Sequence, residues 1–529
     1  MKWIDEAIFY QVYPQSFKDS NGDGIGDFGG IVSKLDYIRN TGFNAIWINP
    51  CFESPFLDAG YDITDYYKTA ERYGTINDLR GLFDEVHKRD MHVILDLVPG
   101  HTSYLHPWFL KSMSRDKNDC TDRYVWTDYV GRDVENVTGV TGWLRGISDR
   151  NGACAVNYKA CQPALNFGFG KVTDEYGWQQ SPADAGPRAN IEEMKKIMSF
   201  WLDLGCDGFR VDMAGSLVKN DDEQYETIKI WDEINGYIHE KYPEAVTISE
   251  WGEPSRALRG GFDADFLLSF GPSHYMDLFR NDNMLDFKSG THFFSKRGKG
   301  DLTNFKAAYE GFYEQAKKGG MICIPSGNHD IPRMAPQMDE DEIKLAFVFL
   351  MTFAGAPFVY YGDEIGMRYI EKLPSVEGGY HRTGARTPMQ WDKSKNCGFS
   401  DGKSENLYLP VDPDENRPDV ASQIEDNTSI YNTVRKLIKL RKQYKCLGNK
   451  GDLKFLEVSA ESYPLVYERS YGGESMVVII NPCERCVECD LGDIGEIIYQ
   501  IGGEPRTEAE KIKVMPCSAF IAKYKNKAV

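Results

Sequence analysis

The sequence lacks the long apolar runs that membrane proteins carry. No stretch holds about 18 consecutive uncharged apolar residues, the length that a membrane-spanning helix requires. The N-terminal segment includes Lys2, Asp5 and Glu6, and it has neither an apolar core nor a small-residue cleavage site of the kind found in secretory leaders. We therefore expect a cytoplasmic protein without a membrane partner.

Positive charge is also scarce. The chain has 61 Lys and Arg against 80 Asp and Glu, which gives a formal net charge of −19. A surface of this sign repels phosphate backbones, so we expect no nucleic-acid partner. A neutral small molecule remains compatible with this charge.

Cysteine is sparse, with 12 residues among 529, and most are scattered. Together with the missing leader, this predicts reduced thiols rather than disulfides. The one close run is Cys483, Cys486 and Cys489. It lies in a strand-like stretch where positions three apart face opposite sides, which favours ordinary thiols over a zinc site.

Aromatic residues, by contrast, are frequent, at 13% of the chain. Their rings fill apolar cores, and they also stack on the apolar faces of sugars. With 41% hydrophobic residues and no low-complexity tract or internal repeat, the composition is that of a folded protein. The length of 529 residues predicts one large domain with smaller ones attached.

Short β-branched or aromatic runs alternate with amphipathic segments along most of the chain. Such alternation favours a parallel sheet whose strands are joined by helices. Eight runs of this kind predict an α/β fold, a closed (β/α)₈ TIM barrel whose C-terminal strand ends carry the chemistry. The predicted strands are Phe9–Pro14, Phe43–Pro50, His92–Val98, Gly208–Asp212, Ala245–Glu250, Ala264–Ser269, Met321–Ser326 and Pro357–Tyr361, and the predicted helices include Ile31–Thr41, Ile76–Arg89, Ile191–Leu204 and Glu226–Lys241.

Two regions interrupt this alternation. From His101 to Arg188 the chain is rich in Gly, Asp and Asn without helical periodicity, which predicts a subdomain inserted after the third strand. Beyond Cys446, the strand-like runs Leu453–Val458, Ser475–Asn481 and Ala519–Tyr524 predict a terminal antiparallel β-sandwich. We assign residues 1–101 and 186–445 to the barrel, 102–185 to the inserted subdomain and 446–529 to the C-terminal β-sandwich domain.

Polar side chains stand at the ends of four predicted strands. One such carboxylate could simply cap a loop, but four in barrel order, with Arg and His beside them, indicate a site at the barrel mouth. The residues are Asp96 and His101 after the third strand, Arg210 and Asp212 on the fourth, Glu250 after the fifth, and His329 and Asp330 after the seventh.

Three carboxylates that converge on a barrel mouth suit the cleavage of a glycosidic bond. One can attack the anomeric carbon, a second can protonate the leaving oxygen and a third can hold sugar hydroxyls. Arg210 lies two residues before Asp212 and so on the same face of its strand, where a fixed cation would keep that carboxylate ionised. Histidine can donate to hydroxyls where negative charge is unfavourable.

In this order, the segments resemble the sequence motifs of the α-amylase family, glycoside hydrolase family thirteen, and especially its oligo-1,6-glucosidase and α-glucosidase branch. The resemblance runs from Tyr10–Phe17 to Arg386–Trp391. It implies a retaining hydrolase with Asp212 as nucleophile, Glu250 as general acid/base and Asp330 as transition-state stabiliser. It also implies that His101, Arg210 and His329 line the first sugar subsite.

A further stretch, Tyr61–Tyr66, resembles the family segment that binds the terminal glucose. The resemblance implies a stacking ring from Tyr61 and a carboxylate from Asp62, with Arg382 as the matching basic residue. An Asp62–Arg382 pair would close the far end of the subsite, so that one glucose at a time leaves a non-reducing end. The alternative is that Arg382 makes only a surface ion pair.

The run 19–27 places oxygen-bearing side chains at alternate positions, with Gly24 at the sharp turn. This matches the first part of a calcium-loop pattern, although Gly30 stands where that pattern has a bidentate glutamate. Family members carry a structural Ca²⁺ or Mg²⁺ at the matching loop; an ordinary Asx and glycine turn is the alternative. No organic cofactor is expected. The ion's ligands would be Asp19, Asn21, Asp23, the Ile25 carbonyl and Asp27.

Four positions depart from the family pattern. Gly100 stands where many α-amylases have an asparagine that binds a second calcium, so we do not expect that ion. Ala164 replaces an acidic residue in a motif of the inserted segment. Met213 and Ser249 are unusual beside the nucleophile and the acid. These changes leave the three carboxylates intact and the preferred linkage open.

Taken together, these features predict an exo-acting α-glucosidase of short oligosaccharides with α-1,6 or α-1,4 linkages, as a monomer or weak homo-oligomer. A glucosyl transferase or isomerase on sucrose- or trehalose-type substrates would use the same three carboxylates. A non-catalytic scaffold of this fold is disfavoured, because the carboxylate set is complete.

Overall fold

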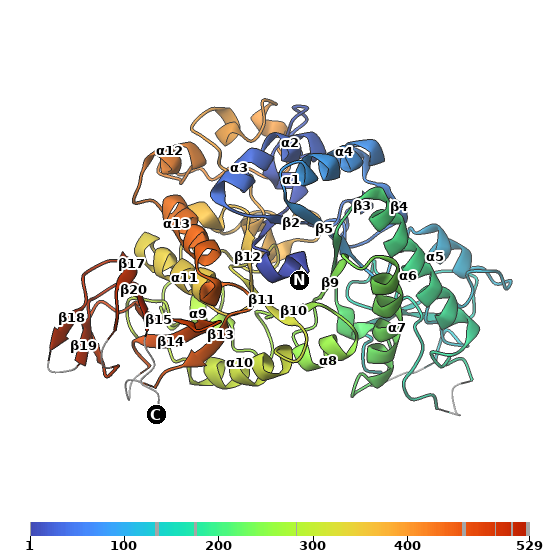
Figure 1. Cartoon of the computed structure of the whole chain (residues 1–529). Helices are drawn as coiled ribbons and strands as arrows, with labels where there is room; N and C mark the ends of the chain where they lie inside the picture. Colours follow the sequence, from blue (N-terminus) through green and yellow to red (C-terminus); the bar gives the residue numbers. More distant parts are fainter. Residues whose placement is uncertain are drawn as a thin grey trace.

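A closed barrel of eight parallel strands forms the centre of the computed structural model, which describes residues 2–132, 137–173, 177–281, 283–457, 462–491, 494–508 and 511–524 (Figure 1). Each strand coincides with one of the eight predicted from the sequence, so the predicted (β/α)₈ fold is confirmed. In their order around the barrel, the strands are β1 (Phe9–Val12), β2 (Ala45–Ile48), β5 (His92–Leu97), β8 (Gly208–Val211), β9 (Val246–Ser249), β10 (Ala264–Phe266), β11 (Met321–Pro325) and β12 (Ala356–Tyr360).

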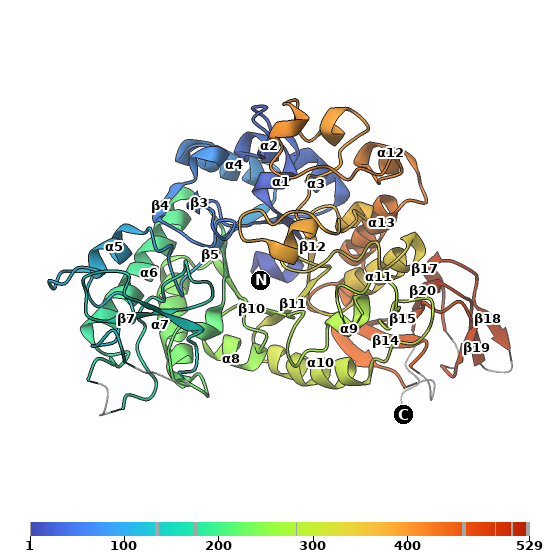
Figure 2. The same cartoon turned by 180° about the vertical axis from the view of Figure 1, so that it is seen from behind.

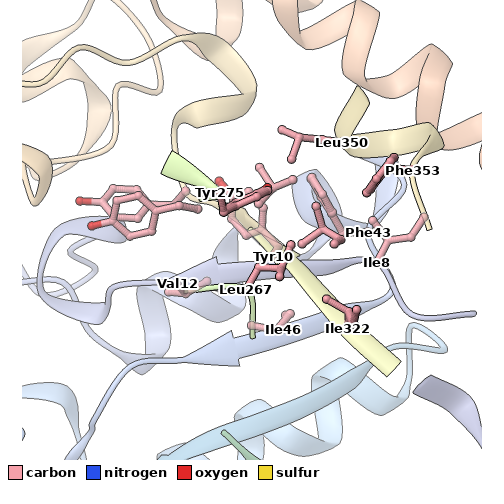
Figure 3. Packing of buried hydrophobic residues seen from close by; sticks show 14 of the residues in the cluster. Ile8, Tyr10, Val12, Phe43, Ile46, Leu267, Tyr275, Ile322, Leu350 and Phe353 are labelled. Atoms are coloured by element: carbon pink, nitrogen blue, oxygen red, sulfur yellow. The ribbon is translucent and has the colours of Figure 1, made fainter. Parts of the chain in front are cut away.

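Side chains of the barrel strands alternate between its inside and its outside. Phe9, Trp47 and Phe358 belong to a buried cluster within the barrel, where the rings of Phe9 and Phe358 stack with their centroids 4.0 Å apart. Tyr10 and Ile46 face outward and pack against the surrounding elements (Figure 3). Because both faces are covered, each strand is a short and mostly apolar run, which is why the sequence revealed it.

Helices surround the barrel and connect its strands (Figures 1 and 2). The predicted helix Ile31–Thr41 is in fact two helices, because the backbone of Lys34 leaves the helical region at φ −113° and ψ 4°. None of the helices in the described part of the chain combines the length and the apolarity that crossing a bilayer requires. The helices are α1 (Pro14–Phe17), α2 (Phe28–Ser33), α3 (Leu35–Thr41), α4 (Ile76–His87), α5 (Pro107–Ser112), α6 (Ala185–Leu204), α7 (Tyr225–Lys241), α8 (Pro254–Arg259), α9 (Met276–Phe279), α10 (Thr303–Ala316), α11 (Glu340–Thr352), α12 (Val420–Glu425) and α13 (Ile430–Gln443).

The segment between β5 and α6 contains α5 and the hairpin β6 (Gly142–Arg145) and β7 (Ala153–Val156). An antiparallel bridge between His101, shortly after β5, and Ala164 connects this segment to the barrel. Ala164 itself is buried in a small apolar cluster with Val125, Ala155 and Phe169. A carboxylate at position 164 would be buried among apolar side chains, where an unpaired charge is costly.

Two antiparallel sheets end the chain, on the side of the barrel opposite the inserted segment (Figures 1 and 2). The predicted strands Ser475–Asn481 and Ala519–Tyr524 are present; part of the predicted strand Leu453–Val458 lies outside the described residues. The predicted domain boundaries stay predictions. The five-stranded sheet has the order β13 (Asp452–Phe455), β14 (Leu465–Tyr471), β15 (Glu474–Asn481), β20 (Ser518–Lys523) and β17 (Ile497–Ile501), and the three-stranded sheet has the order β16 (Val487–Cys489), β19 (Lys511–Val514) and β18 (Arg506–Glu508).

Candidate active site

A cavity of about 870 Å³ opens at the C-terminal ends of the barrel strands. Asp212 follows β8 and Glu250 follows β9 directly, and Asp330 lies in the loop after β11, as the sequence predicted. Of the other predicted site residues, Tyr61, His101 and Arg382 line the cavity. Asp58, Tyr158, Lys159, Gln162, Gln224, Trp251, Glu253, Leu268, Phe270, Met284 and Tyr380 line it without having been assigned from the sequence.

The Arg210 guanidinium joins three carboxylates behind the cavity. Its Nη1 lies 2.7 Å from Asp96 Oδ1 and 3.0 Å from Asp212 Oδ1, and its Nη2 lies 2.6 Å from Glu250 Oε1. Arg210 and Asp96 are almost completely buried. The sequence analysis noted Asp96 at a strand end but did not assign it a role in the site. One guanidinium therefore holds the two carboxyl groups that a retaining glycosidase needs close together.

Burial opposes the charged form of Asp212 more strongly than the sequence led us to expect. Burial raises the pKa of Asp212 well above its usual range and the Glu250 carboxylate adds to this, while Arg210 acts in the opposite direction. Burial also raises the pKa of Asp96 to about 6 despite its contact with Arg210. The sequence led us to expect Arg210 to dominate. Its single positive charge is instead shared among three carboxylates, so it does not offset burial at each of them.

Two groups hold Glu250 in this structure. Arg210 Nη2 forms an ion pair with Oε1 at 2.6 Å, and the backbone N–H of Met213 donates a hydrogen bond to Oε2 at 3.0 Å. Met213 has a φ of +44°, a left-handed conformation that is uncommon for a residue with a side chain. This conformation directs the amide toward Glu250, so the residue after Asp212 fixes the position of the Glu250 carboxyl group.

Asp265 on β10 organises the chain around Glu250. Its Oδ1 accepts hydrogen bonds from Ser249 Oγ at 2.7 Å and from the Trp251 N–H at 3.0 Å. Burial raises the pKa of Asp265 to about 7. The unusual Ser249 thus has a physical role: it directly precedes Glu250, the predicted acid/base residue, and its hydroxyl binds the buried Asp265.

Asp330, in the cavity wall near Arg382, lies between two arginines. Arg382 Nη1 is 2.7 Å and Arg386 Nη2 is 3.1 Å from Asp330 Oδ1. Burial alone would raise the pKa of Asp330, but His329, Arg382 and Arg386 together hold it well below its usual range. Asp330 is therefore ionised at neutral pH.

Arg382 pairs with Asp58 and not with Asp62. Arg382 Nη2 lies 3.1 Å from Asp58 Oδ1, to which Lys159 Nζ donates at 2.5 Å, and Gln162 Nε2 donates to Asp58 Oδ2 at 2.8 Å. The predicted Asp62–Arg382 pair is wrong. Arg382 does line the cavity and pair with a carboxylate there, but that carboxylate stands four residues earlier than predicted.

Asp62 instead holds its own loop. It is completely buried, and its carboxylate accepts hydrogen bonds from Ser54 Oγ at 3.0 Å and from the backbone N–H of Leu57 at 2.9 Å. Burial raises its pKa to about 6. Asp58 and Asp62 are only four residues apart, and the sequence gives no signal that distinguishes which of the two faces the cavity.

Tyr61 and His329 form a stacked pair, with ring centroids 5.2 Å apart and planes at 4°. The Tyr61 hydroxyl donates to Asp96 Oδ2 at 2.9 Å. Burial lowers the pKa of His329 to about 3, so the ring is neutral. Its Nδ1 faces the amide nitrogens of Gln11 and Asn49, each at 3.2 Å, which leaves Nε2 as the protonated nitrogen, 3.3 Å from Asp330.

His101 lines the cavity, but both of its ring nitrogens bond the protein. Nε2 lies 2.9 Å from the Tyr61 carbonyl, and Nδ1 lies 3.0 Å from Asn157 Nδ2. Lys219 Nζ donates to Asn157 Oδ1 at 3.0 Å. Gly100 makes room for this arrangement, since a Cβ there would lie 2.8 Å from Asn157 Nδ2. The predicted bond from His101 to a sugar hydroxyl would have to replace one of these contacts.

The 19–27 loop adopts the turn that its pattern predicts. Gly24 has a φ of +98°, and a Cβ there would lie 2.1 Å from the Asn406 carbonyl oxygen, so glycine is required. Asp19 accepts hydrogen bonds from the N–H groups of Asn21 at 3.0 Å and Gly24 at 2.8 Å. Its residues supply only oxygen atoms, the donors that Ca²⁺ and Mg²⁺ prefer. Within the described ranges, however, no three His, Cys, Asp or Glu side chains gather into a group that could hold a metal ion.

Comparisons with known proteins agree with this geometry. The sequence matches the family described as alpha amylase, catalytic domain, over residues 11–450. It is 30% identical to an oligo-1,6-glucosidase of Parageobacillus thermoglucosidasius over 97% of this chain and 96% of that protein, and 32% identical to an oligo-1,6-glucosidase of Bacillus sp. (strain F5) over 90% and 99%. The crystal structure of the trehalulose synthase MutB from Pseudomonas mesoacidophila MX-45 has a TM-score of 0.82 and 28% identity, covering 99% of this chain and 100% of that one.

The family match covers the barrel, the inserted segment and every residue of the cavity described above. The solved structure extends the likeness of fold to nearly the whole chain. The chain therefore belongs to the α-amylase family, and it is a glycoside hydrolase.

Proposed function

We propose that the protein is a retaining, exo-acting α-glucosidase that removes terminal, non-reducing α-glucosyl units from short substrates. The observation that supports exo action is the cluster at one end of the cavity, where Arg382 joins Asp58 and Asp330. Paired charges occupy the space that further glucose units would need. The similarity to oligo-1,6-glucosidases supports α-1,6 linkages, with α-1,4 as the other candidate.

The mechanism follows from the three carboxylates. An oxygen of Asp212 attacks the anomeric carbon, the bond to the leaving oxygen breaks, and Glu250 transfers its proton to that oxygen. In the second step Glu250 takes a proton from water, the water oxygen attacks the anomeric carbon, and the bond to Asp212 breaks. Arg210 holds both carboxyl groups in place. Asp330, ionised between its arginines, would bind the sugar hydroxyls in the transition state.

A linkage panel tests this proposal. Purified protein would be incubated with isomaltose, maltose, sucrose, trehalose and panose, beside an Asp212→Ala variant as the inactive control. We expect glucose to appear first as its α anomer in proton NMR spectra, and only from chain ends. Cleavage confined to internal bonds of long starch chains would overturn the exo assignment.

A glucosyl transferase or isomerase is the second candidate. The likeness to a trehalulose synthase supports it, and so do the apolar side chains Leu268, Phe270 and Met284 on the cavity wall, which would limit water there. Incubation with sucrose separates the two functions. Free glucose and fructose indicate hydrolysis, whereas a new disaccharide in place of free glucose indicates transfer to a sugar hydroxyl.

We further propose that the 19–27 loop holds a structural Ca²⁺ or Mg²⁺ through Asp19, Asn21, Asp23, the Ile25 carbonyl and Asp27. The left-handed turn at Gly24 and the alternating oxygen donors support this assignment. A cytoplasmic location and a monomeric or weakly homo-oligomeric state also stay proposals, which cell fractionation and analytical ultracentrifugation would test.

A further inference from the structure

The cavity has a second end, beyond Glu250, whose walls are apolar. Met213 follows the nucleophile, and Leu268 and Phe270 follow β10, the strand beside the one that leads to Glu250. Leu268 lies close to the Glu250 loop, since a Cβ at Gly252 would be 2.8 Å from Leu268 Cδ1. We call this set the apolar end of the cavity; it consists of Met213, Trp251, Leu268, Phe270 and Met284.

The leaving group must extend into this end. Glu250 protonates the leaving oxygen, so that oxygen lies between the glucose and Glu250, and the atoms attached to it continue past Glu250. The opposite direction is closed by Asp58 and Arg382. Phe270, which lines the cavity, is 54% exposed, and a bound leaving group would cover part of its ring.

The polar groups near the apolar end already have protein partners. Gln224 Oε1 accepts hydrogen bonds from Trp251 Nε1 at 2.8 Å and from Arg256 Nη1 at 2.6 Å. Gln224 Nε2 donates to the Gly215 carbonyl at 2.8 Å, and Glu253 pairs with Arg256 at 3.1 Å. Gln224 Oε1 already accepts two hydrogen bonds, so a hydroxyl of a second sugar would have to displace one of these donors to bond it, which costs free energy.

We propose that the apolar end binds an alkyl or aryl leaving group, so that α-glucosides of apolar alcohols and phenols are better substrates than disaccharides. The proposal rests on the α-glucosidase function above. The bond between the anomeric carbon and the alcohol oxygen breaks, and that oxygen takes the Glu250 proton. Water then supplies the hydroxyl of the released glucose and returns a proton to Glu250, so the products are glucose and the free alcohol.

A series of n-alkyl α-glucosides from methyl to hexyl tests this inference. Their leaving alcohols have similar acidity, so differences in kcat/KM report contact with the protein rather than leaving-group chemistry. We expect kcat/KM to rise about two- to fourfold for each added methylene that becomes buried. We also expect the hexyl glucoside to exceed isomaltose.

Two variants locate the contact. Phe270→Ser and Leu268→Asn should each reduce the gain per methylene. Tyr129→Ser, which replaces an equally exposed ring (54%) outside the cavity, should preserve it. Equal kcat/KM for the methyl and hexyl glucosides, or a faster reaction with isomaltose, would overturn the apolar-end proposal while leaving the α-glucosidase function intact. Hydrolysis of none of these α-glucosides would overturn the α-glucosidase function itself.

Discussion

The two ends of the cavity are built from opposite kinds of side chain. At the glucose end, the buried Asp58 and the partly exposed Asp330 are paired with arginines in a network of fixed charges. At the apolar end, Leu268, Phe270 and Met284 offer contact area and few hydrogen-bonding groups. A charged network recognises one arrangement of hydroxyls, whereas apolar walls accept any group of suitable size. With the proposed α-glucosidase function, this contrast would make the enzyme strict about the sugar and permissive about the leaving group.

The buried carboxyl groups behind the two ends differ in the same way. Asp96 contacts the guanidinium of Arg210, but Asp265 is held by the Ser249 hydroxyl and backbone N–H groups. Burial raises the pKa of Asp96 to about 6 and that of Asp265 to about 7. A cation therefore stabilises the charged form at one end, while the other end tolerates a neutral acid.

The largest effect should come from the residue between the two ends. Asp212→Ala removes the attacking oxygen, and we expect kcat on any α-glucoside to fall by at least about 10⁴-fold. Thermal unfolding of the variant checks that the fold persists. A loss of less than tenfold would mean that neither end of the cavity serves this reaction.

The next effect distinguishes two carboxylates of one loop. Asp58→Asn removes a charge that pairs with Arg382, and we expect kcat/KM to fall about 10²-fold or more. Asp62→Asn is the matched control. It should lower the unfolding temperature and change kcat/KM much less, because Asp62 bonds its own loop. A larger loss of kcat/KM in Asp62→Asn than in Asp58→Asn would support the Asp62–Arg382 pair predicted from the sequence. It would also contradict the contrast drawn between the two ends.

A pH series examines the buried acid behind the apolar end. The folded protein keeps the Asp265 proton up to about pH 7, whereas an unfolded chain releases it near pH 4. This group's contribution to stability is complete below about pH 4 and is lost as the pH rises to about 7.

Asp265→Asn cannot ionise and keeps the oxygen that accepts the Ser249 hydrogen bond. Its free energy of unfolding should therefore fall less than that of the wild type between pH 5 and 8, by at most about 3 kcal/mol. Denaturant unfolding at both pH values measures the difference. Identical pH dependence in the two proteins would show that Asp265 is ionised throughout.

The smallest effect concerns the 19–27 loop, which lies outside both ends of the cavity. Millimolar Ca²⁺ added to chelator-treated protein should raise the unfolding temperature by a few degrees, and Asp23→Asn should abolish the rise. kcat should not change, since the loop residues do not line the cavity. If Ca²⁺ does not change the unfolding temperature of the wild type, the 19–27 loop is an ordinary hydrogen-bonded turn that binds no metal ion.

Much of this protein could be predicted because its signals are local. Each barrel strand is a short run buried on both faces, as Phe9–Val12 and Ala45–Ile48 illustrate. Asp212 and Glu250 follow strands directly, so their place on the barrel mouth depends only on recognising those strands. The same reasoning would have found Asp96, which the sequence analysis noted but did not assign.

The four departures from the family pattern were visible but had no explanation in the sequence. Gly100 makes room for Asn157, and Ala164 fills an apolar cluster of the inserted segment. Met213 turns its amide toward Glu250, and Ser249 bonds Asp265. Each of these four residues is explained by a contact with a residue that lies elsewhere in the chain, so the identity of the residue alone could not reveal the explanation.

The sequence by itself determined the barrel, the order of its strands and the carboxylates at their ends, because burial periodicity and strand-end position are properties of adjacent residues. Only the tertiary structure decided which of Asp58 and Asp62 faces Arg382, and how strongly burial competes with Arg210 at Asp212. Side-chain direction within a loop and the sharing of one charge among three carboxylates depend on elements that meet only after folding.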